Sequence, residues 1–229
     1  GGRPMARCKY CDESGWFLQV NSHGLCVKCQ IEVGSDIDQR VRIVLESIGI
    51  AKKSKNISTA ISRLNLAAGH CDVLQEYYRK GLPTLTVPPV EVAADLRSEV
   101  TRLVGQAIND QRFAARQKAE DAAGDAAKLG GYAKAISVLT KLMDDVSDVT
   151  EIETAIEALR QERDGLRFDL IGRKAEVAAA KGQTKKAVGL WIDAIMALRH
   201  DSTPDAMQSD RIATAEEKIR ELGGEPPAG

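Results

Sequence analysis

The chain has 229 residues, of which 43% are hydrophobic, 28% charged and 4% aromatic, and its formal net charge is −1. This composition excludes a wholly disordered chain, and the scarcity of aromatic residues favours helices over a β-sandwich. No apolar run approaches the roughly 20 residues that span a bilayer, and no secretory leader is recognisable, so we expect a cytoplasmic protein without a membrane partner. Residues 1–5 are expected to be a tag remnant and the start of the chain.

Two pairs of cysteines lie within the first thirty residues: Cys8 with Cys11, and Cys26 with Cys29. Each two-residue gap lets both thiolates of one turn reach the same ion, and two such turns supply the four sulfur ligands that zinc accepts. Two disulfides are the alternative, but they need an oxidising compartment for which the sequence shows no signal. Four thiolates close the coordination shell, so the pattern predicts one structural Zn²⁺ ion.

The segment between the cysteine pairs has the character of a hairpin, with a strand at residues 16–20 and a turn at residues 21–24. Residues 6–30 therefore resemble a zinc ribbon, although Asp12 and Gln30 stand where such cysteine turns usually have glycine. We expect Trp16 and Phe17 to form the small core of this ribbon. His23 is expected to be a solvated turn residue.

Residues 31–81 predict a helical hairpin. Ser35 has the features of an N-cap for the first helix, and apolar residues then recur with helical spacing. The second helix carries Cys71, expected to be a small buried residue, and ends at Gly81. The basic tract at residues 52–55 is the expected loop between the two helices.

Residues 82–89 contain three prolines and predict an extended strap, because proline removes a backbone donor and fixes φ. The net charge changes from +4 over residues 1–80 to −5 over the rest of the chain. Residues 90–224 predict a helical repeat-like domain that opens with a helix reaching about Lys128. Its last helix is expected to begin at Thr203, with Pro204 in the first turn, and residues 225–229 are an expected disordered tail.

An internal repeat relates residues 126–136 to residues 178–188 at an offset of 52. Each copy predicts a helix, a glycine turn and a second helix. The residues expected to pack these turns and helices are Gly130, Ala135 and Leu139 in the first copy and Gly182, Ala187 and Trp191 in the second. Their spacing resembles the tetratricopeptide repeat, which implies a helix hairpin stacked on its neighbour. Any pair of helix hairpins with glycine turns is the alternative.

The sequence thus predicts a mostly α fold, in which a small N-terminal zinc-ribbon β-hairpin module is joined to a helical hairpin and a tetratricopeptide-like antiparallel helical array. No catalytic motif is recognisable, so we expect no enzyme and no small-molecule substrate. An adaptor that binds a protein partner through the helical array is the preferred interpretation. The alternative is a nucleic-acid-binding factor that combines basic residues with the ribbon aromatics. Its basic residues would be Arg7, Lys9, Lys28, Lys52, Lys53 and Lys55.

Overall fold

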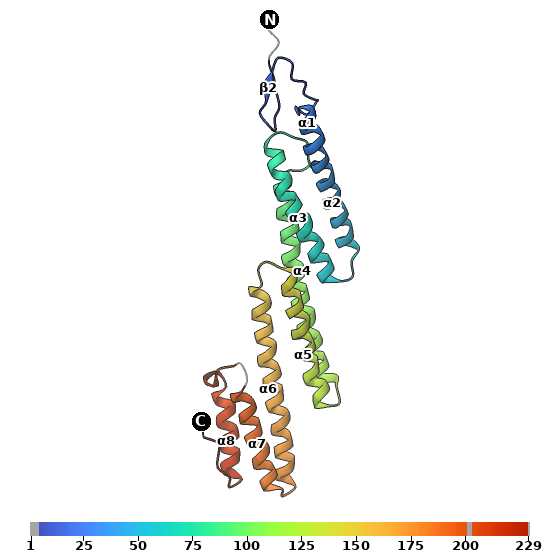
Figure 1. Ribbon diagram of the computed structural model, residues 1–229. Helices are drawn as coiled ribbons and strands as arrows, with labels where there is room; N and C mark the ends of the chain where they lie inside the picture. The colour runs from blue at the N-terminus through green and yellow to red at the C-terminus, as the bar shows by residue number, and fades with distance from the viewer. Residues whose placement is uncertain (1–4, 201–202, 229) are drawn as a thin grey trace. The chain divides into compact units, whose positions relative to one another are not determined.

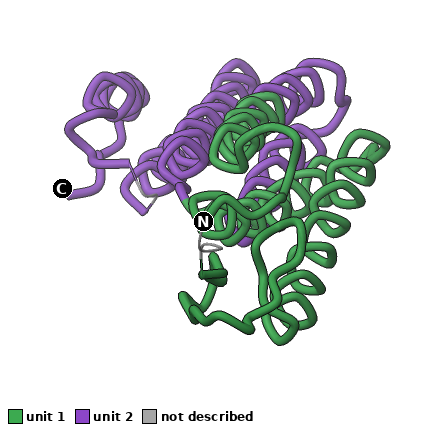
Figure 2. Tube along the Cα trace, turned by 90° about the horizontal axis from the view of Figure 1, so that it is seen from above, with its two compact units in different colours: residues 1–107, 145–147 green, residues 108–144, 148–229 purple. Residues whose placement is uncertain are grey.

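The computed structural model describes residues 5–200 and 203–228, so the expected tag remnant at residues 1–4 lies outside the described part of the chain. The fold is mostly helical, with a two-stranded antiparallel sheet at its N-terminal end (Figure 1). The chain divides into two compact units (Figure 2). Unit 1 contains residues 1–107 and 145–147, and unit 2 contains residues 108–144 and 148–229. This division falls within a long helix, downstream of the Pro-rich strap.

Unit 1 opens with β1 (Ala6–Arg7), which pairs antiparallel with β2 (Ser14–Gly15). The expected turn at residues 21–24 is present, because the side-chain oxygen of Asn21 accepts hydrogen bonds from two backbone N–H groups beyond it. The strand expected at residues 16–20 is wrong. Residues 16–17 form a turn after β2, and only Val20 makes a single bridge, to Cys26. The strand pairing instead flanks the first cysteine pair, where it holds the two ends of that loop together.

The first helix of unit 1 begins directly at the second cysteine pair. α1 (Val27–Cys29) continues through a π-helical turn (Gln30–Gly34) into α2 (Ser35–Lys53). The expected N-cap at Ser35 is therefore wrong: its φ of −61° and ψ of −40° are helical. The cysteine pair, instead of a serine side chain, marks the start of the helix.

The hairpin predicted for residues 31–81 is completed by α3 (Ile57–Arg79), which packs against α2. Its N-cap is Asn56, whose side chain accepts a hydrogen bond from the backbone N–H of Thr59. Residues 82–88 carry neither helix nor strand, and α4 (Pro89–Asp121) follows. One hydrophobic core joins α2, α3 and the start of α4 to the cysteine segment, and Cys71 is buried in it as expected.

Unit 2 contains the rest of α4 and four further α-helices among its described residues. They are α5 (Asp125–Leu142), α6 (Thr150–Ala180), α7 (Thr184–Arg199) and α8 (Ser209–Glu221). Short 3-10 turns lie at Met143–Asp145 and Asp205–Met207. The last residue of the first of these turns, Asp145, belongs to unit 1. α6 packs against α5 and α7, and α7 packs against α8. Ala135, Leu139, Ala187 and Trp191 are all buried.

The last helix begins later than the sequence predicts. Pro204 has φ −56° and ψ 135°, an extended conformation that cannot belong to a first helical turn, and α8 starts at Ser209. Residues 225–228, within the expected disordered tail, carry neither helix nor strand. The guanidinium of Arg199 donates hydrogen bonds to the carbonyl oxygens of Pro227 and Ala228 at 3.3 and 2.6 Å.

The two repeat glycines have different roles. Gly182 adopts φ +71° in the turn between α6 and α7, as expected for a glycine turn. Gly130 lies inside α5, so a turn at that position is wrong, and the helix expected to reach Lys128 ends at Asp121. The residue after Gly130, Gly131, is needed for close packing between α5 and α4, since a Cβ there would lie 2.9 Å from the Cβ of Lys118 in α4.

Candidate metal centre

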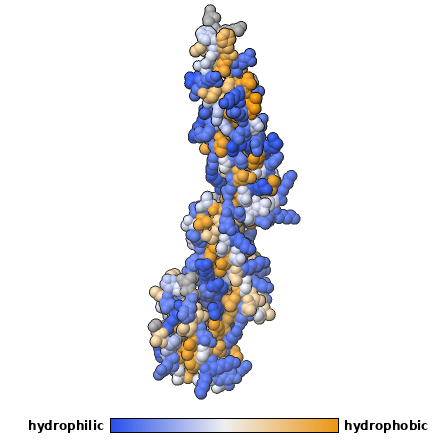
Figure 3. Space-filling view, in the orientation of Figure 1, coloured by the Kyte–Doolittle hydropathy of each residue, from blue (hydrophilic) through white to orange (hydrophobic). Residues whose placement is uncertain are grey.

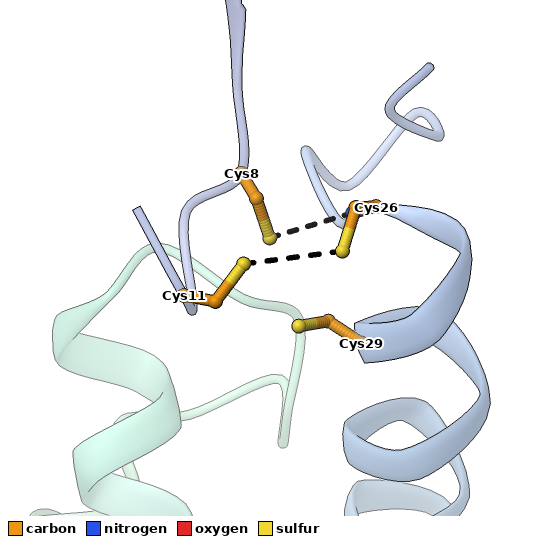
Figure 4. Close-up of side chains that lie close together, drawn as sticks. All are labelled: Cys8, Cys11, Cys26 and Cys29. Carbon is orange, nitrogen blue, oxygen red and sulfur yellow. Dashed lines mark hydrogen bonds between the residues drawn. The ribbon is translucent and has the colours of Figure 1, made fainter. Parts of the chain in front are cut away.

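The four N-terminal cysteines converge on one point (Figure 4). Their Sγ atoms all lie within 4.8 Å of one another, and those of Cys11 and Cys26 are 3.9 Å apart. A tetrahedral ion with metal–sulfur distances near 2.3 Å needs sulfur–sulfur separations of about 3.8 Å. All five cysteines of the chain are free thiols, not disulfides. The donor set and its spacing therefore fit a metal ion, and this cluster can hold one.

Backbone hydrogen bonds position the first cysteine pair. The N–H of Cys8 donates to the carbonyl of Glu13 at 2.8 Å, and the N–H of Asp12 donates back to the carbonyl of Cys8 at 3.0 Å. Asp12 has φ +61°, in the left-handed region that aspartate tolerates better than most residues. It supplies the conformation for which related turns use glycine. Gln30, at the matching position of the second pair, is helical and needs no glycine.

The second pair lies at a helix start. Cys26 is the N-cap of α1 and Cys29 is in its first turn, so the positive end of the helix dipole faces the sulfur cluster. The backbone N–H of Cys26 also donates to Sγ of Cys8 at 3.4 Å. These donors stabilise negative charge on the sulfur atoms. Cys8, Cys26 and Cys29 are buried, whereas Cys11 is exposed.

The thiols of the cluster differ in the direction of their pKa shifts. Burial acts to raise the pKa of Cys8, but backbone N–H groups of Cys11, Cys26 and Tyr10 outweigh it and lower the pKa to about 6. Burial and the neighbouring thiols raise the pKa of Cys29 above its ordinary value. A metal ion binds thiolates, so its binding releases the protons that these thiols still carry.

The aromatic residues after β2 do not form a core. Trp16 is 72% exposed and Phe17 is 98% exposed, so the expectation that they pack inside the ribbon is wrong. The interior is filled by the cysteines and Leu25, which share one core with the helices behind them. Hydrophobic residues are visible among hydrophilic ones near the N-terminal end of the chain in Figure 3.

The basic residues near the cysteines are partly engaged. Arg7 forms an ion pair with Asp12 at 3.2 Å, and Nζ of Lys9 donates to the carbonyl of Gly81 at 3.2 Å. Lys28 is exposed on α1. Lys80, which is not among the basic residues predicted from the sequence, also lies here: its Nζ is 4.3 Å from the centroid of the Tyr10 ring. No local pattern marks Lys80, because only the return of α3 alongside α2 brings it to this end of unit 1.

The second basic group lies elsewhere in unit 1. Lys52 and Lys53 end α2, and Lys55 follows in the loop to α3. The helix is continuous from the second cysteine pair to this loop. Its 26 residue-to-residue steps of about 1.5 Å place Lys52 and Lys53 roughly 39 Å along the helix from that cysteine pair. Lys52, Lys53 and Lys55 therefore lie at the opposite end of this helix from the cysteine pair. In the described part of the chain, no helix is both long and apolar enough to cross a membrane.

Comparisons with protein-family models, with curated proteins and with solved structures found no match to this chain.

Proposed function

We propose that the chain is a non-enzymatic adaptor in which a structural Zn²⁺ ion holds a protein-binding turn on a helical scaffold. The exposure of Trp16 and Phe17 on a turn attached to a four-cysteine site carries this proposal. Four sulfur donors complete a tetrahedral shell and leave no position for a reacting water. The ion therefore supports the shape of the segment, and the exposed side chains supply the binding.

Zinc is the proposed ion because four thiolates in a closed shell are its usual structural site, and iron is the other metal that accepts such a set. Elemental analysis of the purified chain should give one zinc per chain and a colourless protein. Visible sulfur-to-iron absorption would contradict the assignment to zinc. Little bound metal of any kind, together with fewer than four reactive thiols at the cluster, would contradict a metal centre altogether.

The exposed turn has the properties of a protein-binding hot spot. Large aromatic side chains contribute most when they enter a partner pocket, and a metal-fixed turn loses little conformational entropy on binding. Val27 and Ile31, one helical turn apart beside the second cysteine pair, are exposed as well. Aliphatic side chains do not stack on bases, so the exposure of these two residues favours a protein partner over nucleic acid.

Site-specific photocross-linking tests this proposal directly. A photoreactive phenylalanine analogue at Phe17 should give a defined protein adduct in extracts of the source cells, and the adduct should disappear with Trp16→Ser. The same analogue at Phe113, an exposed residue of α4, is the matched control. Equal adducts at both positions, or none at position 17, would rule out the turn as the binding surface.

Nucleic-acid binding is the second candidate, because the same two aromatic side chains lie in a segment that also carries Arg7 and Lys28. Trp16 is itself the probe: the other tryptophan, Trp191, is buried, so Trp191→Phe leaves one exposed tryptophan. Stacking on a single-stranded oligonucleotide would quench the fluorescence of Trp16. The logarithm of the binding constant would then fall with the logarithm of the salt concentration, with a slope of about 0.7 per phosphate contact. The adaptor proposal expects no quenching. Salt-dependent quenching would favour the nucleic-acid function instead.

A further inference from the structure

Unit 2 has an open groove of about 500 Å³ where α5 begins, α6 ends and α7 begins. Five cationic side chains line it, in a half of the chain whose net charge is negative. They are Lys128, Arg173, Lys174, Lys181 and Lys186. The only carboxylate among the described residues of the lining is that of Asp125. The charge of the groove is therefore opposite in sign to the net charge of this half of the chain.

Most of this positive charge is not neutralised within the chain. Asp125 pairs with Lys174 at 2.7 Å. The pKa of Asp125 is held below its usual range by Lys174, with smaller contributions from Arg173 and Lys128, so several cations act on the same carboxylate. In the described part of the chain, Lys128, Lys181 and Lys186 form no ion pair. The groove can hold further carboxylates.

The start of α7 points to an anion as well. Its first turn carries Lys185 and Lys186 and no acidic residue, and no side chain caps it among the described residues. The N-terminus of a helix is the positive end of its dipole, where cations are unfavourable and anions are favourable. An anion bound beside this turn offsets the repulsion between the two lysines and the positive end of the helix dipole. It also accepts hydrogen bonds from the backbone N–H groups of the first turn.

The form of the groove favours a peptide over the other anions. Val177 is 53% exposed and Leu190 half-buried, so aliphatic surface runs between the cations. A site for a small molecule normally encloses most of its ligand, whereas this groove is open. No aromatic side chain is found among its described lining residues, so bases would have nothing to stack on. A segment with both carboxylates and aliphatic side chains matches both features.

We propose that this groove binds a short acidic, amphipathic segment of a protein partner. Carboxylates of the segment pair with Lys128, Lys181 and Lys186, and its aliphatic side chains lie against Val177 and Leu190. This surface belongs to unit 2 and is independent of the exposed turn of unit 1. Loss of binding at one surface therefore says nothing against the other.

The test uses the full chain and a fluorescein-labelled peptide of glutamate and leucine, with binding followed by fluorescence anisotropy at low and at physiological ionic strength. Lys181→Gln with Lys186→Gln should weaken binding about fivefold to tenfold, as expected for the loss of two exposed ion pairs. Asp125→Asn should strengthen it about twofold to threefold, because it removes the competing carboxylate. Circular dichroism checks that each variant folds.

Matched controls separate the groove from general charge. Lys134→Gln with Lys141→Gln removes the same charge from α5 outside the groove and should leave binding unchanged. Absence of peptide binding, or equal losses in both double variants, overturns the proposal. If a peptide of glutamate and glycine binds as tightly as the peptide of glutamate and leucine, aliphatic side chains are not needed, and that part of the proposal is overturned. Inorganic phosphate, a single-stranded oligonucleotide or phosphatidylserine vesicles that bind better than the peptide overturn the choice of a protein segment.

Discussion

Trp191 packs directly on the backbone of α6 at Gly172, and this contact makes a quantitative prediction. A Cβ at Gly172 would lie 2.8 Å from Cη2 and 3.0 Å from Cζ3 of Trp191, closer than carbon atoms normally approach. Gly172→Ala should therefore introduce overpacking of about 1–3 kcal/mol. Alanine also favours the helix over glycine by about 1 kcal/mol. The expected net loss of unfolding free energy is about 0–2 kcal/mol.

The same substitution should have the opposite sign once the indole is shortened. Trp191→Phe removes the outer ring atoms that meet Gly172, so the added methyl group fits. Only the helix preference of alanine then remains, a gain of about 1 kcal/mol. The coupling free energy between the two substitutions should be about 1–3 kcal/mol, well above the ~0.5 kcal/mol scatter of independent sites.

Urea denaturation followed by far-ultraviolet circular dichroism measures this cycle for the parent chain, both single variants and the double variant. Gly189→Ala is the matched control: it lies in the same helix as Trp191, but its Cβ would meet nothing within 4 Å. Gly189→Ala should stabilise the parent chain and the Trp191→Phe variant equally. If Gly172→Ala has the same effect with Trp191 as with Phe at that position, Trp191 does not pack on Gly172 and the reasoning fails.

Three further predictions concern the metal, the helix packing and pH. A chelator should disorder residues 6–30 and expose the cysteine thiols while most helical circular dichroism remains; a full loss of helix signal would show that the helices depend on the metal. Ala187→Leu, at a fully buried position, should lower the unfolding free energy by about 1–3 kcal/mol in urea denaturation, and an unchanged value would contradict close helix packing there. Asp36 accepts hydrogen bonds from Arg40 at 2.7 Å and from Tyr77 at 2.8 Å, and its pKa is lowered, chiefly by Arg40. Its stabilisation is therefore fully present above the ordinary carboxyl pKa of 3.8 and is lost as the pH falls through the lowered pKa of the folded chain. Asp36→Asn should cost about 1–2 kcal/mol at pH 7 and progressively less as the pH falls below 3.8; a cost that does not decrease in acid would contradict this.

The glycines show how far local sequence reaches. Gly130 and Gly182 stand at matching places in the two copies of the repeat, and both predict a turn. Gly182 forms one, while Gly130 continues a helix. A Cβ at Gly130 would meet nothing within 4 Å, whereas a Cβ at the next residue, Gly131, would lie 2.9 Å from the Cβ of Lys118 in α4. A propensity for turns is a property of the segment, whereas a close approach depends on a residue of another helix.

The aromatic residues of the cysteine segment show the same limit. A run of apolar residues between two cysteine pairs is typical of a strand with a small core, and the sequence offers no sign that the core is provided elsewhere. In the structure the core of this segment is shared with α2 and α3, which leaves Trp16 and Phe17 outside. Burial depends on which surfaces meet, and that is decided by the whole fold.

The sequence by itself determined the features that depend on short range. Ligand spacing predicts that Cys8, Cys11, Cys26 and Cys29 share one site, and helical periodicity predicts most helices, because both are set by residues within a few turns of one another. Only the tertiary structure decided what depends on distant segments: the return of Lys80 to the Tyr10 ring through the pairing of α3 with α2, and the gathering of cations from α5, α6 and α7 around Asp125. Each of these arrangements is made by packing between helices, and no single segment carries a signal for it.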